Sequence, residues 1–171
     1  DKPTTGSVEV DGVALQAMSA GELSDLRLLR LGFVFQAYNL IPVLTAYENA
    51  EFVLLLQGVP KKERRERVMK TLADVGLVGM EDRRPSELSG GQQQRVAVAR
   101  AIAGKPALVL ADEPTANLDS TTGHALIALM KQLNEEHGIT FVFATHDPKV
   151  MDAATRVVKL EDGKIASEER R

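Results

Sequence analysis

The sequence contains no cysteine among its 171 residues. This absence excludes a disulfide framework, a zinc-thiolate site and thiol catalysis, and it fits a reducing cytoplasm. Long hydrophobic runs are also missing. Runs such as residues 52–56 and 107–111 have five residues, whereas a helix that spans a bilayer needs roughly 20. If the protein works at a membrane, we expect another chain to cross it.

No single sign of charge dominates the chain. The 21 basic and 24 acidic residues are mixed along the sequence and give a net charge of -3, so no strong field attracts nucleic acid or an anionic membrane surface. The sequence therefore predicts no nucleic-acid partner. The charged run at residues 61–67 is interpreted as a solvated helix face, because its two acids interrupt the basic field.

The length and the 44% content of hydrophobic residues are typical of one globular domain. The first residue is not methionine, and residues 1–6 resemble a loop that enters a domain partway through. We therefore expect the chain to be truncated at its amino end.

Alternating strands and helices predict an α/β fold with a parallel sheet. A helical insertion is expected at about residues 38–88, where helical periodicity follows a capping box at Thr45 and Glu48. Before it, the pattern predicts a hairpin at residues 7–15, a helix from a capping box at Ser19 and a strand at 31–35. After it, the pattern predicts a helix at 91–104, a strand at 108–111, a helix capped by Ser120, a buried strand at 139–144 and a hairpin at 156–167.

The strongest local signal is the run Leu88-Ser89-Gly90-Gly91-Gln92, which places a hydroxyl and two glycines just before a helix. Glycines let backbone amides approach an anion closely, and a helix start carries about half a positive charge. The run therefore indicates a phosphate-binding turn. The alternative interpretation is an ordinary turn with a serine helix cap.

Two adjacent carboxylates, Asp112 and Glu113, follow the apolar strand at residues 108–111. Ligands bind at the carboxyl edge of open parallel sheets. One carboxylate can ligate hydrated Mg²⁺ while the other polarises an attacking water, since alternation along the strand sends the two side chains different ways. The alternative is a strand that ends in two solvated acids.

Weaker signals sit at other ends of predicted strands. His146 comes just after the strand at 139–144, Gln36 ends the strand at 31–35, and residues 116–120 form a turn before a helix. Each could be a plain polar terminus or turn. His124 and His137 are interpreted as surface residues.

Taken in order, these elements resemble the nucleotide-binding domain of ABC transporters along nearly the whole chain. The resemblance implies a parallel sheet of the P-loop NTPase type with flanking helices, a helical insertion and remnants of an antiparallel β subdomain. The sequence at residues 39–42, 44–49 and 116–120 is similar to that of the lipoprotein-releasing and macrolide-exporter branch of the family. ATP and Mg²⁺ are the cofactors that the resemblance implies.

By this resemblance, Ser89, Gly90, Gly91 and Gln92 match the signature motif, which in the family touches the γ-phosphate of ATP held by the opposite subunit. Gln36 matches the glutamine that contacts Mg²⁺ and the catalytic centre and senses the membrane partner.

The acids and the histidine also match family positions. Asp112 matches the Walker B aspartate on Mg²⁺, Glu113 the catalytic glutamate and Asp119 the aspartate at the dimer interface. His146 matches the histidine that contacts the γ-phosphate. The resemblance implies a homodimer of nucleotide-binding domains, a permease that docks near Tyr38–Tyr47, and a cytoplasmic location on the inner face of the cell membrane.

The chain departs from the family in one respect: it has no stretch of the form G-x-x-x-x-G-K-[ST]. Gly104-Lys105 is followed by Pro106, and Ala99 stands where the first glycine belongs. We expect the first strand and the phosphate loop to be missing, which removes burial worth on the order of 10 kcal/mol. The isolated chain is then expected to be inactive, marginally stable and prone to strand exchange or self-association.

Two other functions stay open at this stage. A soluble ABC ATPase of DNA repair or chromosome maintenance would carry a long coiled coil or a zinc module between Gln36 and Leu88, but these residues are only 52 positions apart and no cysteine is present. Alternatively, the chain as it stands is a non-enzymatic fragment.

Overall fold

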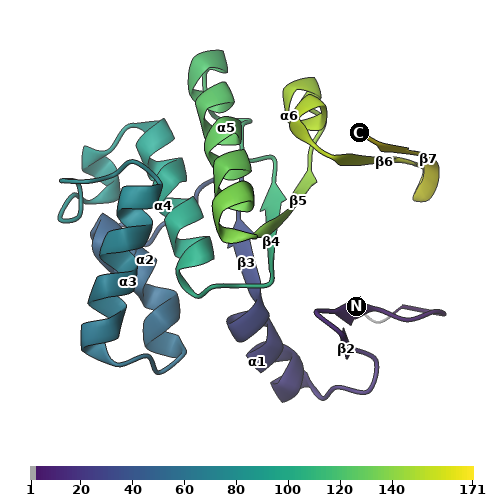
Figure 1. Cartoon of the computed structure of the whole chain (residues 1–171), viewed down its shortest axis with the longest axis horizontal. Helices are drawn as coiled ribbons and strands as arrows, with labels where there is room; N and C mark the ends of the chain where they lie inside the picture. The colour runs from purple at the N-terminus through teal and green to yellow at the C-terminus, as the bar shows by residue number, and fades with distance from the viewer. Residues whose placement is uncertain (1–2) are drawn as a thin grey trace.

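A three-stranded parallel sheet lies at the centre of the computed structural model, which describes residues 3–171 (Figure 1). The strands are β3 (Leu31–Val34), β4 (Leu108–Asp112) and β5 (Thr140–Ala144), in the spatial order β3-β4-β5. The predicted α/β fold with a parallel sheet is confirmed.

The register of the sheet brings the carboxyl ends of the three strands to one edge. Val34 of β3 pairs with Ala111 of β4, and Asp112 of β4 pairs with Ala144 of β5. Because neighbouring strands lie about 4.8 Å apart, residues that follow these three positions emerge close together.

Helices on one side of the sheet form the helical part of the molecule (Figure 1). They are α2 (Ala46–Leu56), α3 (Lys61–Asp74), the short 3-10 helix η1 (Pro85–Glu87) and α4 (Gly90–Ala103). Helix α4 contacts α2, α3 and β3, so it joins this part to the sheet. Leu54, Leu72 and Val96 are fully buried between these helices, and their burial explains why the insertion folds as one unit with α4.

Two more helices complete the region around the sheet. Helix α5 (Ser120–His137) buries the predicted apolar stripe that includes Leu126, Met130 and Leu133. It ends at Gly138, whose φ of 67° suits a residue without a Cβ. Helix α6 (Pro148–Ala153) was not predicted, although Asp147 caps it and Pro148 occupies its first turn.

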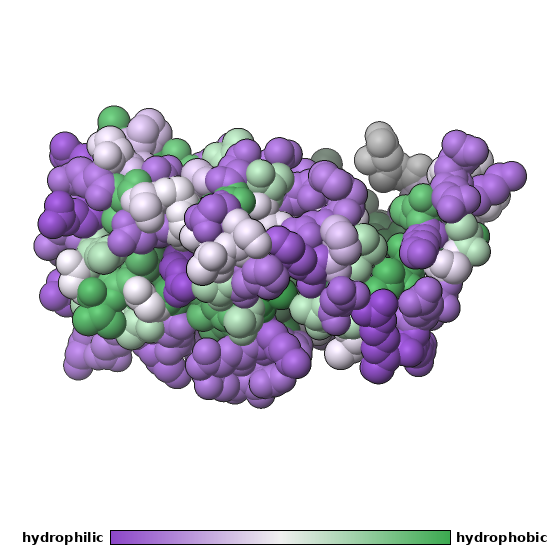
Figure 2. Space-filling model, turned by 90° about the horizontal axis from the view of Figure 1, so that it is seen from above, coloured by the Kyte–Doolittle hydropathy of each residue, from purple (hydrophilic) through white to green (hydrophobic). Residues whose placement is uncertain are grey.

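The amino-terminal and carboxy-terminal regions each form an antiparallel hairpin, as predicted. The first pairs β1 (Glu9–Val10) with β2 (Val13–Ala14) and precedes α1 (Ala20–Arg30); the second pairs β6 (Arg156–Glu161) with β7 (Lys164–Arg170). Of the predicted loop at residues 1–6, residues 3–6 have no helix or strand, and residues 1 and 2 lie outside the described residues. Seen from above, hydrophobic residues stand among hydrophilic ones at the end of the molecule that carries β6 and β7 (Figure 2).

Three local predictions are wrong. Strand β5 is not buried: it lies at the edge of the sheet, its residues alternate between exposed and half-buried, and Val142 is 48% exposed. The cap of α5 is Asp119 rather than Ser120, since the Asp119 carboxylate accepts from the backbone N–H groups of Thr121 and Thr122. A carboxylate can accept both bonds at once, which explains why Asp119 takes the cap position.

The run at residues 61–67 is not solvated throughout. Arg64 is mostly buried, donates to the carboxylate of Glu51 at 2.8 Å and donates to the carbonyl of Val59 at 2.7 Å. In the described part of the chain, no helix is both long enough and apolar enough to cross a membrane.

Candidate functional site

The catalytic carboxylate predicted from the sequence lies at the carboxyl end of the central strand. Glu113 follows Asp112, the last residue of β4, and its backbone N–H still donates to the carbonyl of Ala144 at 2.9 Å. Its φ of 42° is in the left-handed region, which costs a residue with a Cβ about 1–2 kcal/mol. Such strain is found most often where a site requires a particular geometry.

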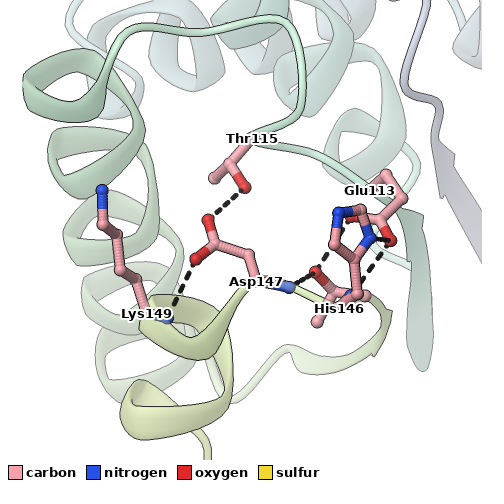
Figure 3. Close-up of polar contacts among 6 residues, drawn as sticks. Glu113, Thr115, His146, Asp147 and Lys149 are labelled. Atoms are coloured by element: carbon pink, nitrogen blue, oxygen red, sulfur yellow. Dashed lines mark hydrogen bonds and ion pairs between the residues drawn. The ribbon is translucent and has the colours of Figure 1, made fainter.

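Three donors from the end of β5 hold the Glu113 carboxylate (Figure 3). The hydroxyl of Thr145 donates to Oε2 at 3.0 Å, and the backbone N–H of His146 donates to Oε1 at 3.0 Å. The Nδ1 atom of His146 lies 2.6 Å from the same Oε1. The Glu113 side chain is 19% exposed, whereas that of His146 is 88% exposed. The structure thus brings Glu113 and His146 together.

The hydrogen bonds decide the charge of Glu113. Partial burial raises its pKa, but the bonds from His146 and Thr145 act in the opposite direction and together leave the pKa below its ordinary value of 4.5. The carboxylate is therefore charged at neutral pH, and its own chain supplies three hydrogen bonds to it.

A second carboxylate, Asp147, extends this network to the loop that follows β4. It accepts from the Thr115 hydroxyl at 3.0 Å and from the backbone N–H of Lys149 at 2.9 Å (Figure 3). Its own N–H donates to the Thr145 hydroxyl at 3.0 Å. The bond from Lys149 N–H lowers the pKa of Asp147, and that from Thr115 adds to it, against the opposing effect of burial. Asp147 therefore ties the end of β5 to the loop that carries Glu113.

The predicted phosphate-binding turn is a regular helix start. Ser89 caps α4 by accepting from the Gln92 N–H at 3.3 Å, while the Gln92 side chain accepts from the Ser89 N–H at 2.8 Å. The hydroxyl hydrogen of Ser89 and the N–H groups of Gly90 and Gly91 are not used by the helix itself. Both the cap interpretation and the anion-binding interpretation thus fit this turn.

Its two glycines are also required by packing inside the chain. A Cβ on Gly90 would lie 2.9 Å from the Tyr38 hydroxyl, and one on Gly91 would lie 2.4 Å from a methyl group of Thr122. A side chain at either position would force the Tyr38 or Thr122 side chain to shift. The glycines therefore have a structural role whatever else they bind.

The Asp119 side chain is engaged within its own helix. In addition to the two backbone N–H groups, it accepts from the Thr122 hydroxyl at 2.6 Å. The bonds from Thr122 lower the pKa of Asp119 most strongly. Its predicted place at a dimer interface is not tested by a single chain.

Asp112 and Gln36, the predicted Mg²⁺ ligands, are both exposed at the same edge of the sheet. In residues 3–171, no group of three or more His, Cys, Asp or Glu side chains could hold a metal ion. Mg²⁺ is commonly held by one or two side chains together with phosphates and water. An exposed carboxylate and an exposed amide fit that kind of site but not a closed metal cage.

Two surface hollows lie elsewhere, beside α2 and α3. One is lined by Tyr47, Glu51 and the basic start of α3, and the other by Tyr47, Arg65, Met69, Glu81 and Asp82. The Gly104-Lys105 pair, which does not match the phosphate-loop pattern, follows the carboxyl end of α4. The helix dipole at that end disfavours a bound phosphate.

Sequence reasoning missed several residues around the site. Thr145, Asp147 and Thr115 hold the Glu113 loop, and a contact between Tyr38 and Asn117 joins this same loop to the loop after β3. The residues at 145–148 carried a usable signal, because Asp-Pro commonly starts a helix. The contact between Tyr38 and Asn117 had none, since 79 positions separate the two residues.

Comparisons with known proteins agree with the resemblance. The ABC transporter family matches residues 1–116. An uncharacterized ABC transporter ATP-binding protein of Thermotoga maritima is 47% identical over all of this chain and 73% of its own length. The macrolide export ATP-binding/permease protein MacB of Rhodopirellula baltica is 44% identical over 99% of this chain and 25% of its own length.

Solved structures give the same result. The ATP-binding cassette MJ0796, from Methanocaldococcus jannaschii, has been solved as a dimer in a post-hydrolysis state bound to ADP and Pi. It superposes with a TM-score of 0.85 and 44% identity, covering 99% of this chain and 75% of the cassette. The sequence match, the identities and the shared fold together place this chain in the ABC transporter family, as an ATP-binding subunit.

Proposed function

We infer that this chain supplies half of an ATPase site that works with ATP and Mg²⁺ between two copies of the subunit. The observation that carries the proposal is the contact of Glu113 with His146 at the carboxyl edge of the parallel sheet, 2.6 Å apart. Ligands bind at this edge in open α/β sheets. A charged carboxylate next to an exposed imidazole suits the binding and hydrolysis of a phosphoanhydride such as ATP better than a structural role.

Different residues of the chain would bind the metal ion and the phosphates. Asp112 and Gln36 would hold Mg²⁺, which neutralises charge on the phosphates when bound. Ser89 and the N–H groups of Gly90 and Gly91 would donate to the γ-phosphate bound by the opposite copy, and Gln92 would hold Ser89 in place through the capping box. Asp119 would lie near the partner copy at the interface. Each group is exposed or half-buried, so none has to be uncovered by unfolding.

Glu113 would accept a hydrogen bond from the attacking water, and Gln36 would help to position the reacting groups. A carboxylate with a lowered pKa is a weak base, so Glu113 suits polarisation of the water better than removal of its proton at an early stage. His146 would donate to the γ-phosphate. Its imidazole is largely exposed and can turn toward a ligand without breaking the backbone bond to Glu113.

Residues 1–171 would form one nucleotide-binding domain, with residues 38–88 as its helical part. The segment near Tyr38–Tyr47 would dock a permease subunit at the inner face of the cell membrane. The MacB relatives, named as export ATP-binding/permease proteins, favour an exporter of the macrolide or lipoprotein-releasing type.

The absence of a G-x-x-x-x-G-K-[ST] stretch from the sequence leads to a direct test. Titration calorimetry of residues 1–171 with Mg-ATP should detect no binding in the micromolar range, because the loop that grips the β- and γ-phosphates in this family is not in this sequence. Micromolar binding would contradict this part of the proposal. DNA binding that weakens with salt would instead favour the DNA-repair class of ABC ATPases.

A chain extended at its amino end with a family phosphate loop tests the roles of the residues. Glu113→Gln should abolish turnover and keep ATP binding, and near-normal turnover would refute the assignment. Ser89→Ala should lower kcat by about 10², as for loss of one donor to developing charge. A change of less than twofold would remove Ser89 from the mechanism.

A further inference from the structure

One long polar side chain is completely enclosed in the protein. Gln94 of α4 is 0% exposed, and its Nε2 donates to the backbone carbonyl of Pro114 at 2.9 Å. Among the described residues, no group pairs with its Oε1. A buried amide with an unused acceptor is unfavourable, because that oxygen gives up its hydrogen bonds to water. An apolar side chain of the same length would fill this space as well, so the bond to Pro114 is the feature that requires a glutamine.

Pro114 directly follows Glu113, the proposed catalytic carboxylate. Glu113 has a φ of 42°, a strained value that persists where the surrounding structure holds it. Pro114 is buried and has no N–H, so its carbonyl is the one main-chain group through which a hydrogen bond can fix it. Because the proline ring also sets φ, a fixed carbonyl leaves little freedom to the peptide bond that joins Pro114 to Glu113. Gln94 therefore restrains the backbone of Glu113 through Pro114.

The backbone around Glu113 is held from three directions. The Glu113 N–H donates to the carbonyl of Ala144 in β5 at 2.9 Å, and the Glu113 carbonyl accepts from the N–H of Ala116 at 3.2 Å. The bond from Gln94 is the third attachment, one residue further along the chain. Gln94 belongs to the buried part of α4, so this attachment comes from the core of the molecule. The loop is thus anchored to α4 as well as to β5.

We propose that Gln94 is a positioning residue for Glu113: its amide holds the Pro114 carbonyl and thereby keeps the Glu113 carboxylate at the end of β5. There the carboxylate accepts from the Thr145 hydroxyl and the His146 N–H (Figure 3). The consequence for catalysis rests on the proposed function, in which Glu113 polarises the attacking water. The restraint on the backbone does not, because it consists of a hydrogen bond within this chain.

Gln94→Met separates the donor from the volume that it fills. Methionine has nearly the length of glutamine but no donor, so the core stays filled while the Pro114 carbonyl loses its partner. The variant also removes the unused Oε1, and these two effects on stability oppose each other. The melting temperature should therefore stay within about 4 °C of wild type.

Amide hydrogen exchange, followed by NMR in the chain extended at its amino end with a phosphate loop, tests the restraint. The N–H groups of Glu113 and Ala116 report on the backbone that Gln94 holds. The amide of Leu72, which is fully buried in α3, reports on opening of the whole molecule. Relative to Leu72, Gln94→Met should speed exchange of both reporter amides about three- to tenfold, as for loss of one hydrogen bond.

Gln57→Met is the matched control for this measurement. The Gln57 Nε2 also donates to a backbone carbonyl of a distant residue, that of Leu28 at 2.9 Å. Because the two sites share no partner, this variant should change exchange at Glu113 and Ala116 by no more than about 1.5-fold. If Gln94→Met leaves both reporter amides unchanged, or if the control speeds them equally, the restraint is refuted.

ATPase kinetics of the same extended chain test the consequence for catalysis. Gln94→Met should lower kcat at least about tenfold, since a displaced catalytic group loses rate steeply with distance. KM for ATP should stay within about twofold, because Glu113 acts on the attacking water rather than on nucleotide binding. A kcat within about twofold of wild type would overturn the positioning role. If the wild-type chain has no ATPase activity, the proposed function fails, and the exchange result alone decides whether Gln94 restrains Glu113.

Gln94→Glu restores the donor through pH and separates positioning from folding. Its side chain can donate to the Pro114 carbonyl only when protonated, and burial raises the pKa of a carboxyl by disfavouring its charged form. The ratio of its kcat to that of wild type should therefore rise at least about threefold from about pH 8.5 to about pH 6.5, after correction for the folded fraction measured by circular dichroism. The same ratio for Gln94→Met should stay constant. A constant ratio for Gln94→Glu would contradict the need for a donor at this position.

Discussion

Gly32 in β3 allows a direct test of how tightly the sheet is packed. A Cβ at this position would lie 2.4 Å from the carbonyl oxygen of Ala101 in α4 and 3.1 Å from a methyl group of Val109 in β4. The first neighbour is backbone and cannot rotate away. Gly32→Ala should therefore move β3 or α4 by about 1 Å, at a cost of about 1–3 kcal/mol as for other overpacked cores.

Part of this cost is offset, because alanine loses less backbone entropy than glycine on folding, by about 0.5–1 kcal/mol. We expect a net loss of about 1–2 kcal/mol in the free energy of unfolding, measured by urea denaturation. For a chain of this length, the melting temperature should fall by roughly 3–8 °C. The Gln36 amide resonance should also shift, since Gln36 lies two residues beyond the end of β3.

Gly21 of α1 is the matched control. The nearest atom to a Cβ there is the Ser19 hydroxyl oxygen at 4.0 Å, so Gly21→Ala has room in an exposed helix. It should stabilise the protein by up to about 1 kcal/mol. The argument from close packing is wrong if the free energy of unfolding of Gly32→Ala, measured by urea denaturation, lies within about 0.5 kcal/mol of the wild-type value. It is also wrong if both variants lose the same stability.

Three further predictions concern side chains around the site and the helical part. Because the folded-state pKa of Glu113 is lowered, its hydrogen bonds stabilise the fold above the ordinary pKa of 4.5, and this contribution is lost as the pH falls through the folded-state value; Thr145→Val should raise that pKa in an NMR titration, and an unchanged pKa would exclude the Thr145 bond. Asn49 is fully buried with four hydrogen bonds to residues 41–45, so Asn49→Ala should cost about 3 kcal/mol. Asn49→Asp should cost more at pH 7, since a charge would face three carbonyls, and the difference should shrink in acid. Arg64→Leu should lower the free energy of unfolding by about 2 kcal/mol, because it leaves the mostly buried Glu51 without its cationic partner. Arg67→Leu breaks an i,i+4 pair with Glu63 and should change the free energy of unfolding by no more than about 0.5 kcal/mol in the same denaturation assay.

The elements that the sequence predicted correctly are those fixed by neighbours along the chain. The capping boxes at Ser19 and Thr45 are present with both of their hydrogen bonds, because each depends only on a residue three positions further on. The strands at the centre of the sheet were also predictable from short apolar runs between turns. Their order places Gln36, the two acids and His146 at one edge, as parallel topology requires.

The predictions that failed depend on contacts between distant residues. The sequence of β5 is as apolar as that of a buried strand, but whether it is buried depends on a neighbouring strand, which its own residues cannot specify. Arg64 looked solvated because its partner Glu51 lies 13 positions away, on another helix. The same holds for Tyr38 and Asn117, whose contact becomes visible only once the sheet places their loops side by side.

The geometry at Glu113 links the histidine to the carboxylate energetically. The left-handed backbone of Glu113 is unfavourable by about 1–2 kcal/mol, and each of its three donors offsets a part of that, since a hydrogen bond contributes about 1 kcal/mol net and somewhat more to a charged acceptor. If the exposed imidazole of His146 turns away toward a ligand, the carboxylate loses one donor and keeps those from Thr145 and the His146 N–H. Glu113 would then be held more weakly and would have one more free lone pair. An anion that recruits His146 should therefore also make Glu113 available to water, so the two changes occur together.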